Sequence, residues 1–165
     1  MLNTTLHLYK QNFKFSSAHF LIFDSKSAEK LHGHNYQVEV EILVPPDEKI
    51  DSKLEEKGFF IDFNVFKKFI KQRLDQWDEM ILMPAKHPDM RIAHKAPSVE
   101  IKFRDRHYVF PKIEVHLLPI TNTSVEQLSR LLAQDFFKEF QRYGVLEVRV
   151  KVEETPGQAA ATTVR

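Results

Sequence analysis

The sequence contains no cysteine, little glycine and almost no net charge, and each shortage excludes a class of protein. The absence of cysteine excludes disulfides, thiolate zinc sites and cysteine nucleophiles. Only four glycines are present, and neither the dinucleotide-binding nor the P-loop glycine pattern occurs. The 24 basic and 23 acidic residues give a net charge of +1, so no strong field favours a nucleic acid or a membrane surface as partner.

Long hydrophobic runs are missing as well. No apolar stretch approaches the ~18 residues of a membrane-spanning helix, and the first residues lack the apolar segment of a signal peptide. A length of 165 residues with 42% hydrophobic residues, 14 of them Phe, is enough for one core. We therefore expect one domain over residues 1–165 in a cytoplasmic protein without nucleic-acid or membrane partners.

Alternating apolar residues predict strands near both ends of the chain. Residues 32–44 alternate best, with apolar side chains on one face and polar side chains on the other. Pro45-Pro46 should end this strand. The same period, looser in the first case, predicts further strands over residues 6–15, 145–154 and 159–165.

Apolar residues at helical spacing from Val65 to Trp77 predict a first helix. Either Asp62 or Asn64 can accept a hydrogen bond from its first turn and cap it. The short apolar run 58–63 just before it is typical of a buried segment, so we expect it to be buried.

A hairpin and a second helix follow. Residues 99–110 alternate around a central turn and predict the hairpin, with a strand over 113–118 after it. The second helix should begin at the capping box formed by Thr123 and Glu126 and end at Gly144. The predicted order is therefore two strands, a helix, an inserted hairpin, a helix and two strands.

Three histidines form a candidate metal site. His32 and His34 lie two residues apart at the start of a predicted strand, so both side chains project from one face. His19 lies in the preceding segment and can supply a third ligand. Three histidines with an open fourth position are the ligand set of a catalytic zinc. Two histidines near a turn are also ordinary polar residues, so the spacing alone leaves both interpretations open.

Ala18-His19 and His32-Gly33-His34-Asn35-Tyr36 together resemble the metal-binding stretch of the 6-pyruvoyl-tetrahydropterin synthase family. That family includes the bacterial 6-carboxytetrahydropterin synthases of the queuosine pathway. The resemblance continues in order along the chain at Ile61-Asp62-Phe63, Asn122-Thr123-Ser124-Val125-Glu126 and Glu154-Thr155-Pro156. These matches span nearly the whole sequence.

The resemblance implies an α+β T-fold, in which a four-stranded antiparallel sheet carries two helices on one face in the order ββααββ. Residues 85–120 would then be an insertion, with a hairpin between the helices. It also implies a closed homo-oligomer, usually a hexamer of two trimers, with Zn2+ on His19, His32 and His34. The implied substrate is a small pterin, 7,8-dihydroneopterin triphosphate.

Glu154 and Ser124 are the candidate pterin-binding residues. Strand parity places Glu154 on the apolar face of its strand, while Glu153 points to the other face. A carboxylate on an inward face needs a partner, and a pterin offers two adjacent donors. The resemblance implies that Glu154 anchors the ring and that Ser124 lies near it. From the residues alone, Glu154 can also reach solvent at a strand end, and Ser124 can be a helix N-cap.

The sequence departs from the family pattern at the residues that move protons. Where the family usually has a cysteine before His-Gly-His, this chain has Ala28. Glu29, the next residue, gives Glu-Lys-Leu-His-Gly-His, which resembles the variant that cleaves the side chain to 6-hydroxymethyl-dihydropterin. Glu29 is therefore a candidate catalytic base, although a solvated loop residue beside Lys30 fits the sequence equally well.

The second departure concerns the relay histidine that the family carries in Leu-Asp-His. Here the corresponding residues are Trp77-Asp78-Glu79. Asp78 and Glu79 are candidate catalytic residues, but one of them would have to keep a proton near neutral pH to replace the histidine. The sequence thus predicts a zinc-dependent pterin lyase with altered chemistry, or alternatively a non-catalytic oligomer that binds zinc and a pterin.

Overall fold

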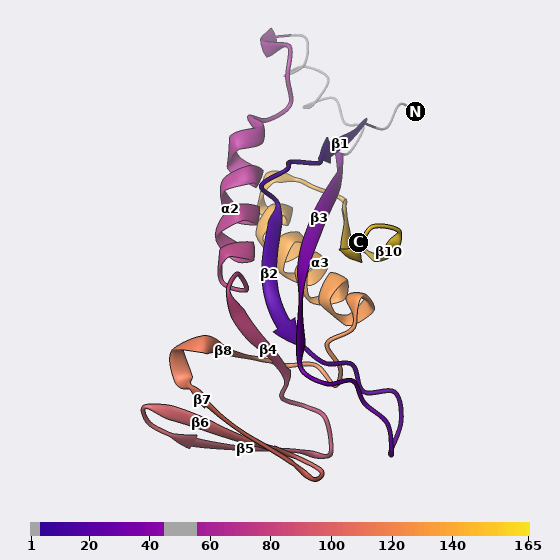
Figure 1. Cartoon of the computed structure of the whole chain (residues 1–165). Coiled ribbons are helices and arrows are strands. Elements are labelled where there is room, and N and C mark those ends of the chain that lie inside the picture. Colours follow the sequence, from indigo (N-terminus) through magenta and orange to yellow (C-terminus); the bar gives the residue numbers. More distant parts are fainter. Residues whose placement is uncertain (1–3, 45–55) are drawn as a thin grey trace.

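Strand β3 (His32–Val44) is the centre of the main sheet in the computed structural model, which describes residues 4–44 and 56–165 (Figure 1). Its predicted alternation is confirmed, because its even-numbered side chains from Tyr36 to Val44 are buried. Pro45-Pro46 lies outside the described residues. Four neighbouring antiparallel strands follow in the order β10 (Gln158–Val164), β9 (Glu147–Thr155), β3 and β2 (Lys14–His19).

Two helices cover one face of this sheet, as Figure 1 shows: α2 (Phe63–Asp75) and α3 (Val125–Phe140). Their buried side chains and the inward side chains of β3 and β9 form one apolar core. The predicted α+β architecture is therefore confirmed. No helix within the described ranges combines the length and the apolar character needed to cross a membrane.

The predicted strand over 6–15 is divided in two. β1 (Thr4–Leu8) and β2 both pair with β3, β1 with its C-terminal half and β2 with its N-terminal half. A turn separates them, in which the Phe13 amide donates to the Lys10 carbonyl over 2.9 Å. The alternation hides this turn because Phe13 remains buried in the core.

Both helix starts were only partly predicted. Asp62 is the N-cap of α2 and accepts from the Asn64 amide, but the run before it is not buried, since Phe59 and Phe63 are 55% and 44% exposed. The N-cap of α3 is Ser124 and not Thr123, which places the predicted capping box one residue too early. Gly144 ends the helical region with φ +82°, as predicted.

Residues after α2 extend the sheet beyond the prediction. β4 (Met80–Pro84) runs parallel to β2 on one side and to β8 (Val115–Leu118) on the other. Between β4 and β8 a second, three-stranded antiparallel sheet contains the predicted hairpin and one strand that was not predicted. It consists of β5 (Met90–Lys95), β6 (Ser98–Phe103) and β7 (Arg106–Pro111).

Candidate metal centre

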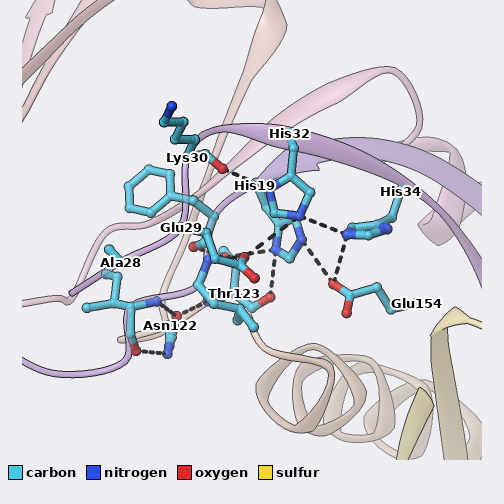
Figure 2. A network of polar contacts seen from close by, with 12 residues as sticks. His19, Ala28, Glu29, Lys30, His32, His34, Asn122, Thr123 and Glu154 are labelled. Atoms are coloured by element: carbon cyan, nitrogen blue, oxygen red, sulfur yellow. Dashed lines mark hydrogen bonds and ion pairs between the residues drawn. The ribbon is translucent and has the colours of Figure 1, made fainter.

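Three imidazoles meet where β2 ends and β3 begins. His19 is the last residue of β2 and pairs across the strands with His32, the first residue of β3. His34 projects from the same face of β3, two residues on. One ring nitrogen from each of the three histidines lies within 4.8 Å of the others (Figure 2). The predicted triad therefore forms a group that can hold a metal ion.

Backbone carbonyls fix the orientation of two of these rings. The Nδ1 of His19 lies 3.1 Å from the Thr123 carbonyl, and the Nδ1 of His32 lies 2.7 Å from the Lys30 carbonyl. Since a carbonyl only accepts, each Nδ1 carries the proton and each Nε2 keeps a free lone pair. Carbonyl partners of this kind orient the histidine ligands of metal sites.

The Nε2 atoms have the surroundings of metal ligands. His19 is fully buried, and its Nε2 makes no hydrogen bond. Burial lowers the pKa of His19 below its ordinary value of 6.5, which favours the neutral imidazole that binds a metal. The Nε2 atoms of His32 and His34 lie 2.9 Å apart, a separation at which two lone pairs repel unless a cation or a proton lies between them. These residues fit a metal ion.

Glu154 of β9 lies on one side of the imidazoles. Its Oε1 is 3.0 Å from the His19 Nε2 and 3.6 Å from the His34 Nε2, and it accepts from the Tyr36 hydroxyl over 3.3 Å. Burial, and then the neighbouring Glu154 carboxylate, raise the pKa of Tyr36, so its hydroxyl stays protonated as a donor. Glu153 points away and pairs with Lys151 over 3.5 Å. The parity argument therefore gives the right direction for both glutamates.

Glu29 lies on the other side of the cluster. Its Oε2 is 3.7 Å from the His32 Nε2 and accepts from the Leu21 amide over 3.0 Å (Figure 2). Its side chain is 31% exposed. The structure therefore places the Glu29 carboxylate beside the imidazoles, and its role as a catalytic base stays a prediction. Ala28, next to it, packs against apolar neighbours.

Asp78 and Glu79 have different surroundings. Asp78 accepts from the Ser16 amide over 2.7 Å, so one of its carboxylate oxygens holds the turn between α2 and β4. Glu79 is exposed, has a left-handed backbone at φ +59°, and lines a cavity of about 590 Å³. His34 and Glu154 line the same cavity. Of the two predicted acids, Glu79 is therefore the one that shares a cavity with the imidazoles.

The start of α3 contributes to the site in a way that sequence reasoning missed. The Ser124 hydroxyl accepts from the Gln127 amide over 3.4 Å, which is the N-cap role that the sequence left open. Thr123, assigned only to a capping box, supplies the carbonyl that binds His19 and donates its hydroxyl to the Phe20 carbonyl. The Asn122 side chain bonds to both the amide and the carbonyl of Ile22. One signal in the sequence could have identified Asn122 and Thr123 as site residues. They lie beside Ser124, within one of the stretches that resemble the family.

Comparison with known proteins supports the same family. The family model for 6-pyruvoyl tetrahydropterin synthase matches residues 8–164. A putative 6-carboxy-5,6,7,8-tetrahydropterin synthase of Methanocaldococcus jannaschii is 27% identical over 150 residues, covering 89% of this chain and 87% of the relative. A protein of the same description from Pyrococcus abyssi is 28% identical over 152 residues, covering 92% and 86%.

Comparison with solved structures points to the same family. The 6-pyruvoyl tetrahydropterin synthase of Plasmodium vivax superposes with a TM-score of 0.85 at 25% identity, over 99% of each chain. A mutant of that protein, described as altered at a catalytic glutamate, has the same fold at 24% identity and a TM-score of 0.85, again over 99% of each chain. The T-fold is thereby confirmed. With nearly its whole length matched by the family model, the chain belongs to the 6-pyruvoyl tetrahydropterin synthase family.

Proposed function

We propose that the chain is a zinc-dependent pterin lyase that acts on 7,8-dihydroneopterin triphosphate and cleaves its side chain to give 6-hydroxymethyl-dihydropterin. One observation carries the proposal. Two carboxylates, Glu154 and Glu29, flank one cluster of three imidazoles, with oxygens 3.0 Å and 3.7 Å from imidazole nitrogens. Family membership supports the lyase class and the pterin substrate.

Zinc suits the ligand set of His19, His32 and His34. Three neutral imidazoles with room for a further ligand are typical of catalytic zinc. When bound there, zinc would supply a Lewis acid that lowers the pKa of the substrate hydroxyls. The carbonyls of Thr123 and Lys30 hold two of the rings in the required tautomer.

Glu154 is proposed to hold the pterin ring. A pterin presents an amino group beside a ring N–H, and a carboxylate accepts from both at once. The side chain of Glu154 is 15% exposed and lines the cavity of about 590 Å³, so it is accessible from a space of ligand size. The Tyr36 hydroxyl fixes one carboxylate oxygen, which limits the rotation of the group.

Glu29 is proposed to move the proton. It takes the proton of the hydroxyl on the second side-chain carbon, and that carbon becomes an aldehyde as its bond to the first carbon breaks. The electron pair of the broken bond remains on the first carbon, which then takes up a proton. The products are 6-hydroxymethyl-dihydropterin and a triphosphorylated two-carbon aldehyde, so no oxidant or reductant is needed.

A closed homo-oligomer, such as a hexamer of two trimers, is also part of the proposal. Within the described part of the chain, β8 and β10 end the main sheet without a further neighbour. Exposed edges of this kind favour pairing with another subunit. Family membership supports assembly, and the molecular mass in solution measures it.

A second candidate function is a zinc- and pterin-binding protein without turnover. It is favoured by Ala28, which cannot move a proton, and by Asp78, whose contact with the Ser16 amide makes it a structural residue. A product profile separates the two candidates. Zinc-loaded protein supplied with 7,8-dihydroneopterin triphosphate should form 6-hydroxymethyl-dihydropterin, whereas pterin binding without any product would support the second candidate.

A further inference from the structure

The three-stranded sheet inserted between β4 and β8 contacts the loop that carries Glu29. Arg106, the first residue of β7, donates from Nη1 to the Glu29 carbonyl over 2.5 Å and from Nη2 to the Ala28 carbonyl over 3.0 Å. The planar guanidinium therefore bridges two consecutive carbonyls. Two parallel donors of this kind fix a backbone more tightly than a single point charge does.

Apolar packing holds the same two regions together. The inward side chains Val99, Ile101 and Phe103 of β6 share an apolar cluster with Phe20 and Ile22, which lie at the start of the loop. Other loop residues, Ala28 and Leu31, pack against this cluster. The Arg106 guanidinium also lies 5.5 Å from the centre of the Phe20 ring. The insertion and the loop thus share one small core.

Hydrogen bonds lead from Arg106 to the imidazoles. The Glu29 amide donates to the Leu21 carbonyl over 2.9 Å, and the Leu21 amide donates to the Glu29 carboxylate over 3.0 Å. The carboxylate held in this way faces the His32 Nε2, and the next carbonyl, that of Lys30, binds the His32 Nδ1. A displacement of the backbone at Glu29 would therefore move the carboxylate.

We propose that Arg106 is a positioning residue, through which the inserted sheet holds the Glu29 carboxylate in place beside the metal-binding histidines. Arg106 acts on the backbone of Glu29. Its catalytic effect rests on the proposed function, in which Glu29 moves the proton. The positioning itself rests only on the contacts of Arg106 and can be measured without substrate.

Arg104 provides a matched control. It comes from the turn between β6 and β7 and contacts the same loop, but at its far end, where its Nη2 donates to the Asp24 carbonyl. Its Nε also pairs with Asp89 over 2.8 Å. Arg104→Ala therefore removes an arginine from the same interface and leaves the Glu29 end of the loop intact.

The first test measures amide hydrogen exchange over residues 20–31 in the full-length, zinc-loaded protein. Arg106→Ala and Arg106→Lys should accelerate the exchange of the Leu21 and Glu29 amides, while Arg104→Ala should accelerate exchange only around Asp24. If both Arg106 variants are folded and exchange these two amides as slowly as the unmodified protein, the positioning role is refuted.

The second test measures turnover in a double-mutant cycle. Arg106→Lys and Arg106→Ala should lower kcat by about 10- to 100-fold, since small displacements of a catalytic group have effects of this size, and zinc content should stay unchanged. In a Glu29→Ala background, Arg106→Ala should cause no further loss. A full additional loss there would show that Arg106 does not act through Glu29. An unmodified protein that forms no pterin product would contradict the proposed function, and the exchange experiment would still decide the positioning role.

Discussion

The two carboxylates beside the imidazoles reach the site by different structural means. Glu154 lies near the end of β9, a strand paired on both sides, and its side chain is 15% exposed. Glu29 lies in the connection between β2 and β3, and its side chain is 31% exposed. β9 pairs on both sides as far as Glu153, and the Tyr36 hydroxyl holds the carboxylate of Glu154, the next residue. The backbone of Glu29 instead depends on the side chain of Arg106, 77 residues further along the chain.

This difference matches the work that each group is proposed to do. A ring anchor must keep the same place through the whole reaction, and a strand in the interior of a sheet provides that place. A group that moves a proton must be placed against the reacting atom, and the contacts of Arg106 and of the Leu21 amide place Glu29 within its loop. The comparison therefore predicts binding defects at Glu154 and turnover defects at Glu29.

Removal of His32 should produce the largest effect, because the proposed roles of both Glu154 and Glu29 depend on the metal site. His32→Ala deletes one of three ligands, so zinc affinity should fall by more than the 10- to 100-fold that the loss of an outer partner typically causes. Metal analysis after zinc loading and dialysis checks this, with about one zinc per chain expected for the unmodified protein. The exposed His94→Ala serves as control. Full zinc content in His32→Ala would show that the ligand assignment is wrong.

Replacement of Glu29 tests only the turnover role proposed for this loop residue. Glu29→Ala should lower the rate of product formation by ~10²–10⁴-fold, the usual effect of removing a general acid–base group. Zinc content should not change, because Glu29 is not among the three ligands. Lys26→Ala, an exposed change in the same loop, should leave the rate unaltered. Product formation at an undiminished rate by Glu29→Ala would remove Glu29 from the mechanism.

Replacement of Glu154 tests the binding role proposed for this strand residue. Glu154→Gln should weaken pterin binding by about 10- to 100-fold, since a charge-assisted hydrogen bond contributes roughly 1.5–3 kcal/mol. Glu153→Gln, on the opposite face, should change binding little. Titration of both variants with a pterin checks this. Equal effects would refute the parity argument, and loss of zinc from Glu154→Gln alone would make Glu154 a metal ligand.

The smallest expected effect comes from His116 on β8, outside the site. Burial, and then the nearby Arg73, lower the pKa of His116 below 6.5. The unfolded chain then binds a proton more readily than the folded one, so this contribution to stability is complete above pH 6.5 and declines as the pH falls. His116→Gln should therefore reduce the loss of the free energy of unfolding below pH 6.5. Urea unfolding of the metal-free protein, measured above and below pH 6.5, gives the free energy of unfolding of both variants. If this free energy depends on pH in the same way in His116→Gln and in the unmodified protein, the effect does not come from His116.

Strand periodicity and local motifs were enough to predict one part of the fold. The alternation in residues 32–44 and 145–154 gave β3, β9 and the direction of Glu154, because period-two patterns report which face is buried. The histidine spacing, together with the family resemblance, gave the triad. Gly144 marked a helix end because only a residue that tolerates positive φ fits there.

The rest depends on contacts between distant segments. β4 escaped prediction because its pairing is parallel and entirely non-local, with β2 and β8 as partners. The turn between β1 and β2 was hidden by the buried Phe13. The positioning of Glu29 could not be predicted, since no local pattern relates Arg106 to a carbonyl so far away in the sequence.

The most direct test of the division between the two carboxylates is the steady-state kinetics of Glu29→Ala and Glu154→Gln, measured together on zinc-loaded protein with 7,8-dihydroneopterin triphosphate. We expect Glu29→Ala to lower kcat with little change in KM, and Glu154→Gln mainly to raise KM. If both variants changed the same parameter by similar factors, or if Glu29→Ala raised KM and left kcat intact, the assignment of turnover to the loop and binding to the strand would be contradicted.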